Sequence, residues 1–230
     1  MQEQDPTRIP AILAAVQDAW EGQPDLSLAS FVGMLQAHGM EWSWSDDEVL
    51  ELLGRVRNTY PSLVRPPLTQ PYSVTTRSPS LVVTLDGSTA VVRHPQAPEL
   101  PPALWKFAEV RPLGPGRPLV LLDATGVDHR LGVVEQVRAF DPAAAPALTG
   151  LDRHAVGGAR WLIALADGTR AVLGARLRVW SVKGRQTQCR VLGWRRIERC
   201  EVGADMNVAP VGGGEPLELG PVDAVYLLEV

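Results

Sequence analysis

The sequence predicts an α+β protein, with an N-terminal three-helix module followed by an antiparallel β-rich domain that forms a sandwich or a small barrel. Apolar residues recur at helical spacing up to about residue 60. A proline-rich stretch follows, and beyond it short β-type runs are joined mainly by glycine turns. No helix of normal length separates these runs, so parallel βαβ units are not expected. We place the boundary at Pro66, which gives a helical module over residues 1–66 and a β-rich domain over residues 67–230.

Each of the three predicted helices has its own start signal. Thr7 is the expected N-cap of the first helix. The apolar stripe of this helix contains Ile9, Ile12, Leu13, Val16 and Trp20. Ser27 caps the second helix, which ends at Gly39 in a left-handed C-cap. Ser45 and Glu48 form a capping box that opens the third helix.

The β-rich part contains two hairpins with Asp-Gly turns, the strongest short-range hairpin signal. Asp86-Gly87 lies within SLVVTLDGSTAVV, and Asp167-Gly168 lies within WLIALADGTRAVL. A third turn, at Lys183-Gly184, joins RLRVWSV to TQCRVL. With the runs WKFAEV, PLVLLD, LGVVEQVRAF and AVYLLEV, we expect about eight to ten strands. The two Asp-Gly hairpins, about 80 residues apart, leave open whether this part is one domain or a duplicated pair.

Residues 8–57 resemble the YihD family, small uncharacterised bacterial proteins that are helical throughout. The matching elements are the Arg8-Ile9 start, the Ala19-Trp20 pair, the Pro24-Asp25-Leu26 turn and the Asp46-Asp47 helix start. The resemblance implies a helical module in a bacterial protein and carries over no activity or catalytic residue. In the β-rich part, WLIALADG followed by GWRRIE is similar to the motif order of WYL domains, which sense ligands or nucleic acids. Leu162 stands where that family's name motif has a tyrosine.

Composition and cysteine count bear on the cellular compartment and on whether a metal site is expected. The 230 residues, 45% hydrophobic and 21% charged, are typical of a globular protein. The first residues show no secretory signal and no apolar run is long enough for a membrane helix, so we expect a cytoplasmic protein without a membrane partner. Cys189 and Cys200, with no histidine nearby, do not match a four-ligand zinc site. We expect buried thiols and no metal.

No catalytic or cofactor motif is present. Gly114-Pro115-Gly116 lacks the lysine and the helix of a phosphate-binding loop. The four histidines lie in separate predicted elements, and only Asp128-His129 places a carboxylate beside an imidazole. Because neighbours on a strand point to opposite faces, we interpret His129 as a turn residue. We therefore expect no cofactor and favour a non-catalytic protein, while an enzyme without a short motif stays an alternative.

One segment is strongly basic in a chain whose net charge is −4. Residues 176–200 hold eight basic residues against Glu198 alone, a net charge of +7. By contrast, residues 1–66 hold ten acidic and four basic residues, and residues 201–230 hold six acidic and no basic residues. The segment is therefore a candidate surface for a negatively charged partner.

The basic segment also contains two tryptophans. Period-two alternation places Arg176, Arg178 and Trp180 on one face of a strand. Trp194, Arg195 and Arg196 follow, and a regular strand would point these two arginines to opposite faces. Arginines and aromatic rings on an exposed sheet face hold single-stranded nucleic acid, with phosphates on the guanidinium groups and bases on the rings.

The function we predict is that of a non-catalytic cytoplasmic binding or regulatory protein whose partner the sequence does not name. The alternative is a nucleic-acid-binding protein that uses six residues: Arg176, Arg178, Trp180, Trp194, Arg195 and Arg196. The basic segment has two further interpretations: it docks the protein's own acidic helices or acidic C-terminal segment, or it is a solvated sheet face. The external partners considered are therefore a protein and a single-stranded nucleic acid.

Overall fold

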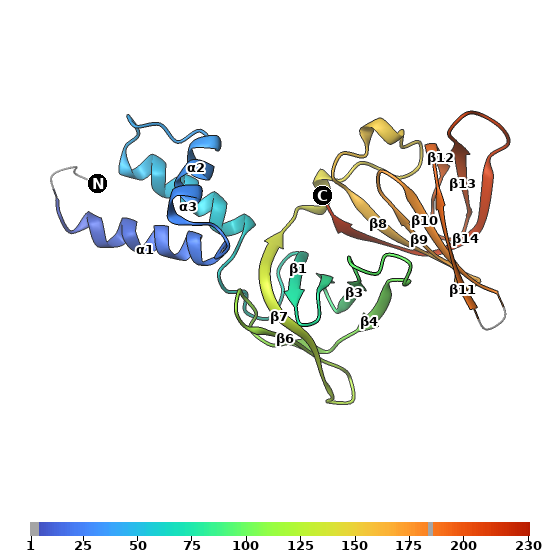
Figure 1. Ribbon diagram of the computed structural model, residues 1–230, viewed down its shortest axis with the longest axis horizontal. Helices are drawn as coiled ribbons and strands as arrows, with labels where there is room; N and C mark the ends of the chain where they lie inside the picture. Colours follow the sequence, from blue (N-terminus) through green and yellow to red (C-terminus); the bar gives the residue numbers. More distant parts are fainter. Residues whose placement is uncertain (1–4, 184–185) are drawn as a thin grey trace. The chain divides into compact units, whose positions relative to one another are not determined.

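The computed structural model describes residues 5–183 and 186–230, which form three α-helices, two 3-10 turns and fourteen strands. The helices are α1 (Arg8–Glu21), α2 (Leu28–Ala37) and α3 (Asp46–Thr59), and the 3-10 turns are η1 (Pro142–Ala144) and η2 (Arg153–Ala155). The strands are β1 (Tyr72–Arg77), β2 (Leu81–Asp86), β3 (Thr89–Arg93), β4 (Ala103–Lys106), β5 (Glu109–Val110), β6 (Pro118–Leu122), β7 (Asp128–Ala139), β8 (Arg160–Leu165), β9 (Arg170–Leu173), β10 (Leu177–Lys183), β11 (Gln186–Leu192), β12 (Trp194–Arg199), β13 (Asp205–Pro210) and β14 (Leu217–Glu229). The predicted α+β fold class is confirmed (Figure 1). Among the described residues, every helix is too short or too polar to cross a lipid bilayer.

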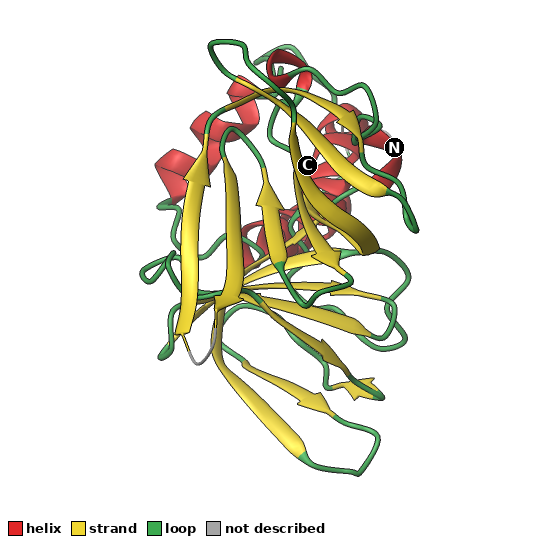
Figure 2. Ribbon diagram, turned by 90° about the vertical axis from the view of Figure 1, so that its right-hand side faces the viewer, coloured by secondary structure: helices red, strands yellow, loops and turns green. Residues whose placement is uncertain are grey.

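The strands form two curled, seven-stranded antiparallel sheets (Figures 1 and 2). The first sheet has the order β4-β3-β2-β1-β7-β6-β5 and the second has the order β11-β10-β9-β8-β14-β13-β12. If the strands of each sheet are numbered in chain order from its own first strand, both sheets have the same strand order. In both, the first four strands form a meander and three more strands follow. The last of these three is the longest strand of the sheet and pairs with the first strand of the meander.

This shared connectivity supports the hypothesis of a duplicated pair, but the two Asp-Gly hairpins do not mark it. Asp86-Gly87 joins the second and third strands of its sheet, whereas Asp167-Gly168 joins the first and second. The third predicted turn, Lys183-Gly184, extends outside the described residues. The strands beside it, β10 and β11, pair antiparallel as expected.

By its internal contacts the chain divides into two compact units, which are described separately. The first unit comprises the residues up to Ala90 together with Trp105–Ala139, and the second comprises Val91–Leu104 and Phe140–Val230. The three helices and most of the first sheet therefore belong to one unit. The domain boundary at Pro66 stays a prediction.

The ends of α2 and α3 follow the predicted capping chemistry. The Ser27 hydroxyl accepts a hydrogen bond from the backbone of the second helix. Both bonds of the Ser45–Glu48 capping box are present, with the Ser45 N–H donating to the Glu48 carboxylate over 2.7 Å. Gly39 has φ 98°, the left-handed conformation expected after α2. These caps satisfy backbone groups that a helix leaves unpaired at its ends.

The first half of α1 differs from the prediction. The Thr7 side chain does not cap the helix, because Thr7 already has helical backbone angles and its hydroxyl donates to Asp5 over 2.7 Å. Ile9 and Leu13, expected in the buried stripe, are 48% and 61% exposed. The reason is that the apolar cluster of the helices includes α1 only from Ala15 onward.

The second sheet has two differently covered faces. Its inner face carries the larger core, which includes Trp161, Ile163, Leu173, Leu177 and Val179. On its outer face, Leu162 packs against Val91 and Leu228 in a smaller cluster. The segment 91–104 therefore contributes apolar cover to the outer face of its own unit.

Candidate binding surface

The strand β10 shows the predicted alternation. Leu177 and Val179 point to the inner face and are 0% and 1% exposed. Arg178 and Trp180 point to the outer face, and Arg176, just before the strand, is exposed. Local period-two geometry thus places the arginines outside the core, as expected.

Trp180 is buried, however, so the expectation that it offers an exposed ring is wrong. It is 4% exposed, and its indole Nε1–H donates to the carbonyl of Glu99 over 2.8 Å. Arg170, directly opposite Trp180 on β9, donates to the carbonyl of Pro102. The segment 91–104 therefore covers the outer face at this point. Alternation predicts which face a side chain takes and not what covers that face.

The strand β12 does not alternate. Its register with β13 shifts between Trp194 and Arg196 and again between Ile197 and Arg199, which is how β-bulges interrupt a ladder. Each extra residue shifts the pattern by one, so Trp194 and Ile197 are buried while the residues between them are exposed. Arg195 and Arg196 are both exposed. The prediction of opposite faces holds for a regular strand, which β12 is not.

Trp194 belongs to the core of the second unit and not to its surface. The side chain is 0% exposed, and its Nε1–H donates to the carbonyl of Gly174 over 2.9 Å. The expected pair of aromatic rings is therefore unavailable for stacking on nucleobases, because such stacking requires an open ring face.

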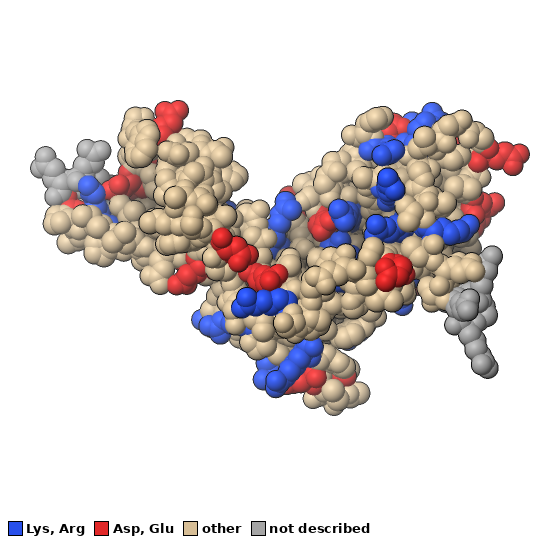
Figure 3. Space-filling view, in the orientation of Figure 1, with Lys and Arg blue, Asp and Glu red and all other residues tan. Residues whose placement is uncertain are grey.

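The arginines of the basic segment differ in their partners. Arg196 lies 3.4 Å from a carboxylate oxygen of Asp152, and Arg199 lies 3.8 Å from one of Glu201; both pairs are about half exposed and stabilise the fold little. Within the described part of the second unit, no carboxylate lies within 4.0 Å of four others: Arg176, Arg178, Arg190 and Arg195. We call these four the arginine surface. Figure 3 shows basic side chains gathered over the visible face of β8–β10.

Arg190 was not among the predicted site residues. It lies on β11 directly opposite Val179, and its side chain is exposed. The pairing of TQCRVL with RLRVWSV through the predicted turn is the sequence signal that places Arg190 on the strand next to Arg178, although on the opposite face of the sheet.

A hollow of about 260 Å³ lies beside the arginine surface. It is lined by Arg153 and Arg176 and by the aliphatic side chains of Val191, Leu192 and Val211. Val191 is 49% exposed and Val211 is 56% exposed. The hollow thus combines guanidinium groups with apolar walls, which suits an aliphatic side chain next to a carboxylate.

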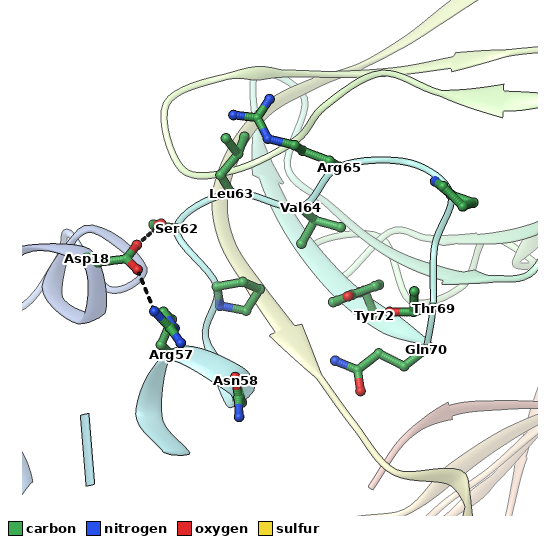
Figure 4. Close-up of a pocket in the computed structure, with 12 residues that line it drawn as sticks. Asp18, Arg57, Asn58, Ser62, Leu63, Val64, Arg65, Thr69, Gln70 and Tyr72 are labelled. Atoms are coloured by element: carbon green, nitrogen blue, oxygen red, sulfur yellow. Dashed lines mark hydrogen bonds and ion pairs between the residues drawn. The ribbon is translucent and has the colours of Figure 1, made fainter. Parts of the chain in front are cut away.

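The first unit contains a more polar hollow of about 500 Å³, where the chain passes from α3 to β1 (Figure 4). Asp18 points into it and accepts hydrogen bonds from Ser62 over 2.5 Å and from Arg57 over 3.3 Å. The carboxylate therefore ties α1 to α3 and to the segment after α3. Since these polar groups bond one another, their role is to hold the junction together.

Asp128 and His129, a carboxylate and an imidazole adjacent in the sequence, bind different partners. Asp128 accepts from Arg111 over 2.7 Å, whereas His129 Nε2 lies 2.9 Å from Asp123. The bond with His129, followed by those from Thr125 and the Val127 backbone, holds the pKa of Asp123 well below its usual range. Both residues lie in β7, so the interpretation of His129 as a turn residue is wrong. The two side chains bind different partners, as neighbours on a strand do.

The two cysteines are free thiols. Cys200 is buried, and burial, reinforced by the nearby Glu201 charge, raises the pKa of its thiol to about 11. Cys189 is half-buried on β11. In the part of the chain that the structure describes, no group of three or more His, Cys, Asp or Glu side chains is arranged to hold a metal ion.

Comparison of the chain with protein-family models, with curated proteins and with solved structures finds no match. The resemblances to the YihD family and to WYL domains therefore stay predictions.

Proposed function

We propose that this chain is a non-catalytic binding protein whose second unit holds an acidic protein partner on the arginine surface. The observation that carries the proposal is the set of four arginines on and beside β10, β11 and β12 without a carboxylate partner in their unit. These cations give this part of the free protein a positive potential. A carboxylate-rich partner neutralises that potential and gains charge-assisted hydrogen bonds to the guanidinium groups.

Two further features favour a protein over a nucleic acid. Burial of Trp180 and Trp194 removes the rings that base stacking needs. The hollow beside Arg176 has aliphatic walls from Val191 and Val211, which suit an aliphatic side chain of a polypeptide. A nucleic-acid backbone is the competing ligand, since arginines also bind phosphates.

A regulatory role in the bacterial cytoplasm is part of the same proposal. Both cysteines are free, which fits a reducing compartment where disulfides are rare. A reversible contact made mainly of charge is also sensitive to ionic strength, as regulatory contacts often are.

The test is fluorescence anisotropy with three labelled probes: a peptide of alternating glutamate and valine, single-stranded DNA and duplex DNA, each at low and moderate salt. We expect the peptide to bind more tightly than either DNA, and its affinity to fall as salt is added. Arg178→Glu and Arg195→Glu should each weaken peptide binding by about tenfold, because a repulsive charge replaces an attractive one. Arg138→Glu is the matched control, since Arg138 is exposed on β7 of the first unit.

The possible outcomes separate the hypotheses. Tighter binding of DNA than of the peptide, lost in Arg178→Glu, would establish the nucleic-acid alternative. No binding of any probe at low salt would make the arginine surface a solvated face and end the proposal.

A further inference from the structure

Three of the four sheet edges are protected against pairing with another strand. The first sheet ends in β4 and β5, which are only four and two residues long. The β12 edge of the second sheet is bulged twice. It is also covered by a loop, because the Gly150 N–H donates to the Ile197 carbonyl and the Ile197 N–H donates to the Leu151 carbonyl. Short strands, bulges and covering loops are the usual means by which proteins block sheet edges.

The fourth edge, β11, has none of these protections. It is seven residues long, pairs with β10 through seven consecutive residues without a register shift, and contains no proline. For Thr187–Leu192, in the described part of the second unit, the ladder with β10 accounts for all backbone–backbone hydrogen bonds. In Figure 1, β11 forms the margin of the second sheet. The outward N–H and C=O groups of this strand are therefore available to another strand.

The side chains of β11 indicate which kind of strand fits. Arg190 lies opposite Val179 and so belongs to the inner-face side, whereas Val191 lies opposite Arg178 and belongs to the outer-face side. Arg190 is exposed and Val191 is 49% exposed. A strand added here meets a cation on one face and an apolar side chain on the other. Alternating acidic and apolar residues satisfy both.

We infer that β11 accepts an extended acidic segment of the partner as an additional strand of the second sheet. Carboxylates of this segment face Arg190, and its alternate apolar side chains face Val191. The inference rests on the proposed function and specifies how the acidic partner is held. Backbone hydrogen bonds provide much of the affinity, and Arg190 selects for acidic residues.

A second copy of this chain is a poor occupant of the same edge. Antiparallel pairing of β11 with its own copy places the Arg190 side chains of the two copies on the same face of the joined sheet. Like charges on paired strands destabilise a sheet. Repulsion between the Arg190 side chains therefore disfavours self-association at this edge, whereas an acidic strand is attracted to it.

The experiment uses the full-length protein and a seven-residue peptide of alternating glutamate and valine, the length of β11. Two matched peptides carry N-methyl groups, one at the glutamates and one at the valines, so that each has lost the amide hydrogens of one edge. We expect one of them to bind about tenfold or more weakly than the parent, because several backbone hydrogen bonds are removed together. Hydrogen exchange at Thr187–Leu192 should slow when the parent peptide is bound.

A charge exchange tests the role of Arg190. Arg190→Glu should weaken binding of the glutamate peptide by about tenfold and should favour a peptide of alternating lysine and valine instead. Equal binding of both peptides to this variant would contradict the contact with Arg190.

The remaining outcomes separate this inference from the proposed function. If both methylated peptides bind as tightly as the parent while Arg178→Glu weakens all three, the acidic partner binds the arginines without adding a strand, and the inference fails alone. If none of the peptides binds, both fail. If light scattering shows a dimer whose β11 amides are protected without peptide, the occupant is a second copy, and the inference is wrong.

Discussion

The indole Nε1–H of Trp180 donates a 2.8 Å hydrogen bond to the carbonyl of Glu99, a residue 81 positions earlier in the chain. Arg170, the cross-strand neighbour of Trp180, donates to Pro102 in the same segment. Two neighbouring strands therefore hold the segment 91–104 against the outer face of their sheet. The tryptophan therefore stabilises the fold and is not available to a partner.

Trp180→Phe tests this structural role. The phenyl ring keeps most of the packing but leaves the Glu99 carbonyl without its donor, so we expect the free energy of unfolding to fall by about 1–2 kcal/mol. Urea unfolding measures this change. Trp42→Phe is the matched control, because Trp42 is 92% exposed, and it should change stability by less than about 0.5 kcal/mol. Equal effects of the two substitutions would show that the bond to Glu99 contributes nothing.

Gly114→Ala tests the close approach of two backbone segments in the first unit. A Cβ at this position would lie 2.1 Å from the carbonyl oxygen of Ser62, so backbone atoms must move. We expect a loss of about 1–3 kcal/mol in the free energy of unfolding. Gly54→Ala should have the opposite sign, because Gly54 lies in α3 with no atom within 4 Å of the added carbon. Alanine there should stabilise the protein by about 0.5–1 kcal/mol.

Thermal and urea unfolding of both glycine variants check the prediction. A Gly114→Ala protein as stable as the wild type would mean that the segment carrying Ser62 is not held against Gly114.

Asp123 gives a prediction for acid stability. Its pKa is lowered in the folded protein, mainly by the bond with His129, so its carboxylate stabilises the fold above the pKa of the unfolded chain. That contribution is lost as the pH falls below about 4 and through the lower folded pKa. We therefore expect the difference in free energy of unfolding between wild type and Asp123→Asn to shrink steadily as the pH is lowered from 5. Urea unfolding at a series of pH values measures it, and a difference independent of pH would show that the charge of Asp123 is not involved.

Features set by local chemistry could be predicted from the sequence. The caps at Ser27 and Ser45 depend on residues within one helical turn, and both are present. The hairpin at Asp167-Gly168 and the faces of β10 likewise follow from turn residues and period-two alternation. The described residues form fourteen strands where about eight to ten were predicted. The strand β1 is one of those missed, because its pattern is partly hidden. Thr76, a polar residue, is fully buried there, and its hydroxyl donates to the Pro79 carbonyl over 3.0 Å.

The errors at the candidate site come from distant parts of the chain. Trp180 is covered by residues about 80 positions away, and no local pattern contains that contact. The bulges of β12 bury Trp194 and expose both Arg195 and Arg196, because an extra residue shifts the alternation. The arginines of the predicted site lie outside the core, whereas its two tryptophans, Trp180 and Trp194, are buried.

The most direct test of the central claim compares two variants of equal net charge. One replaces the arginine surface with serine at Arg176, Arg178, Arg190 and Arg195. The other replaces four exposed arginines of the first unit: Arg65, Arg77, Arg117 and Arg138. Circular dichroism and urea unfolding establish that both fold.

Anisotropy with the labelled glutamate–valine peptide is then measured for both variants at one salt concentration. We expect the first variant to bind roughly a hundredfold more weakly than wild type and the second to bind within about twofold of it, because only the first loses the contacting guanidinium groups. Equal weakening of the two would show that binding depends on total charge alone, and it would contradict a specific acidic-partner site on the second unit.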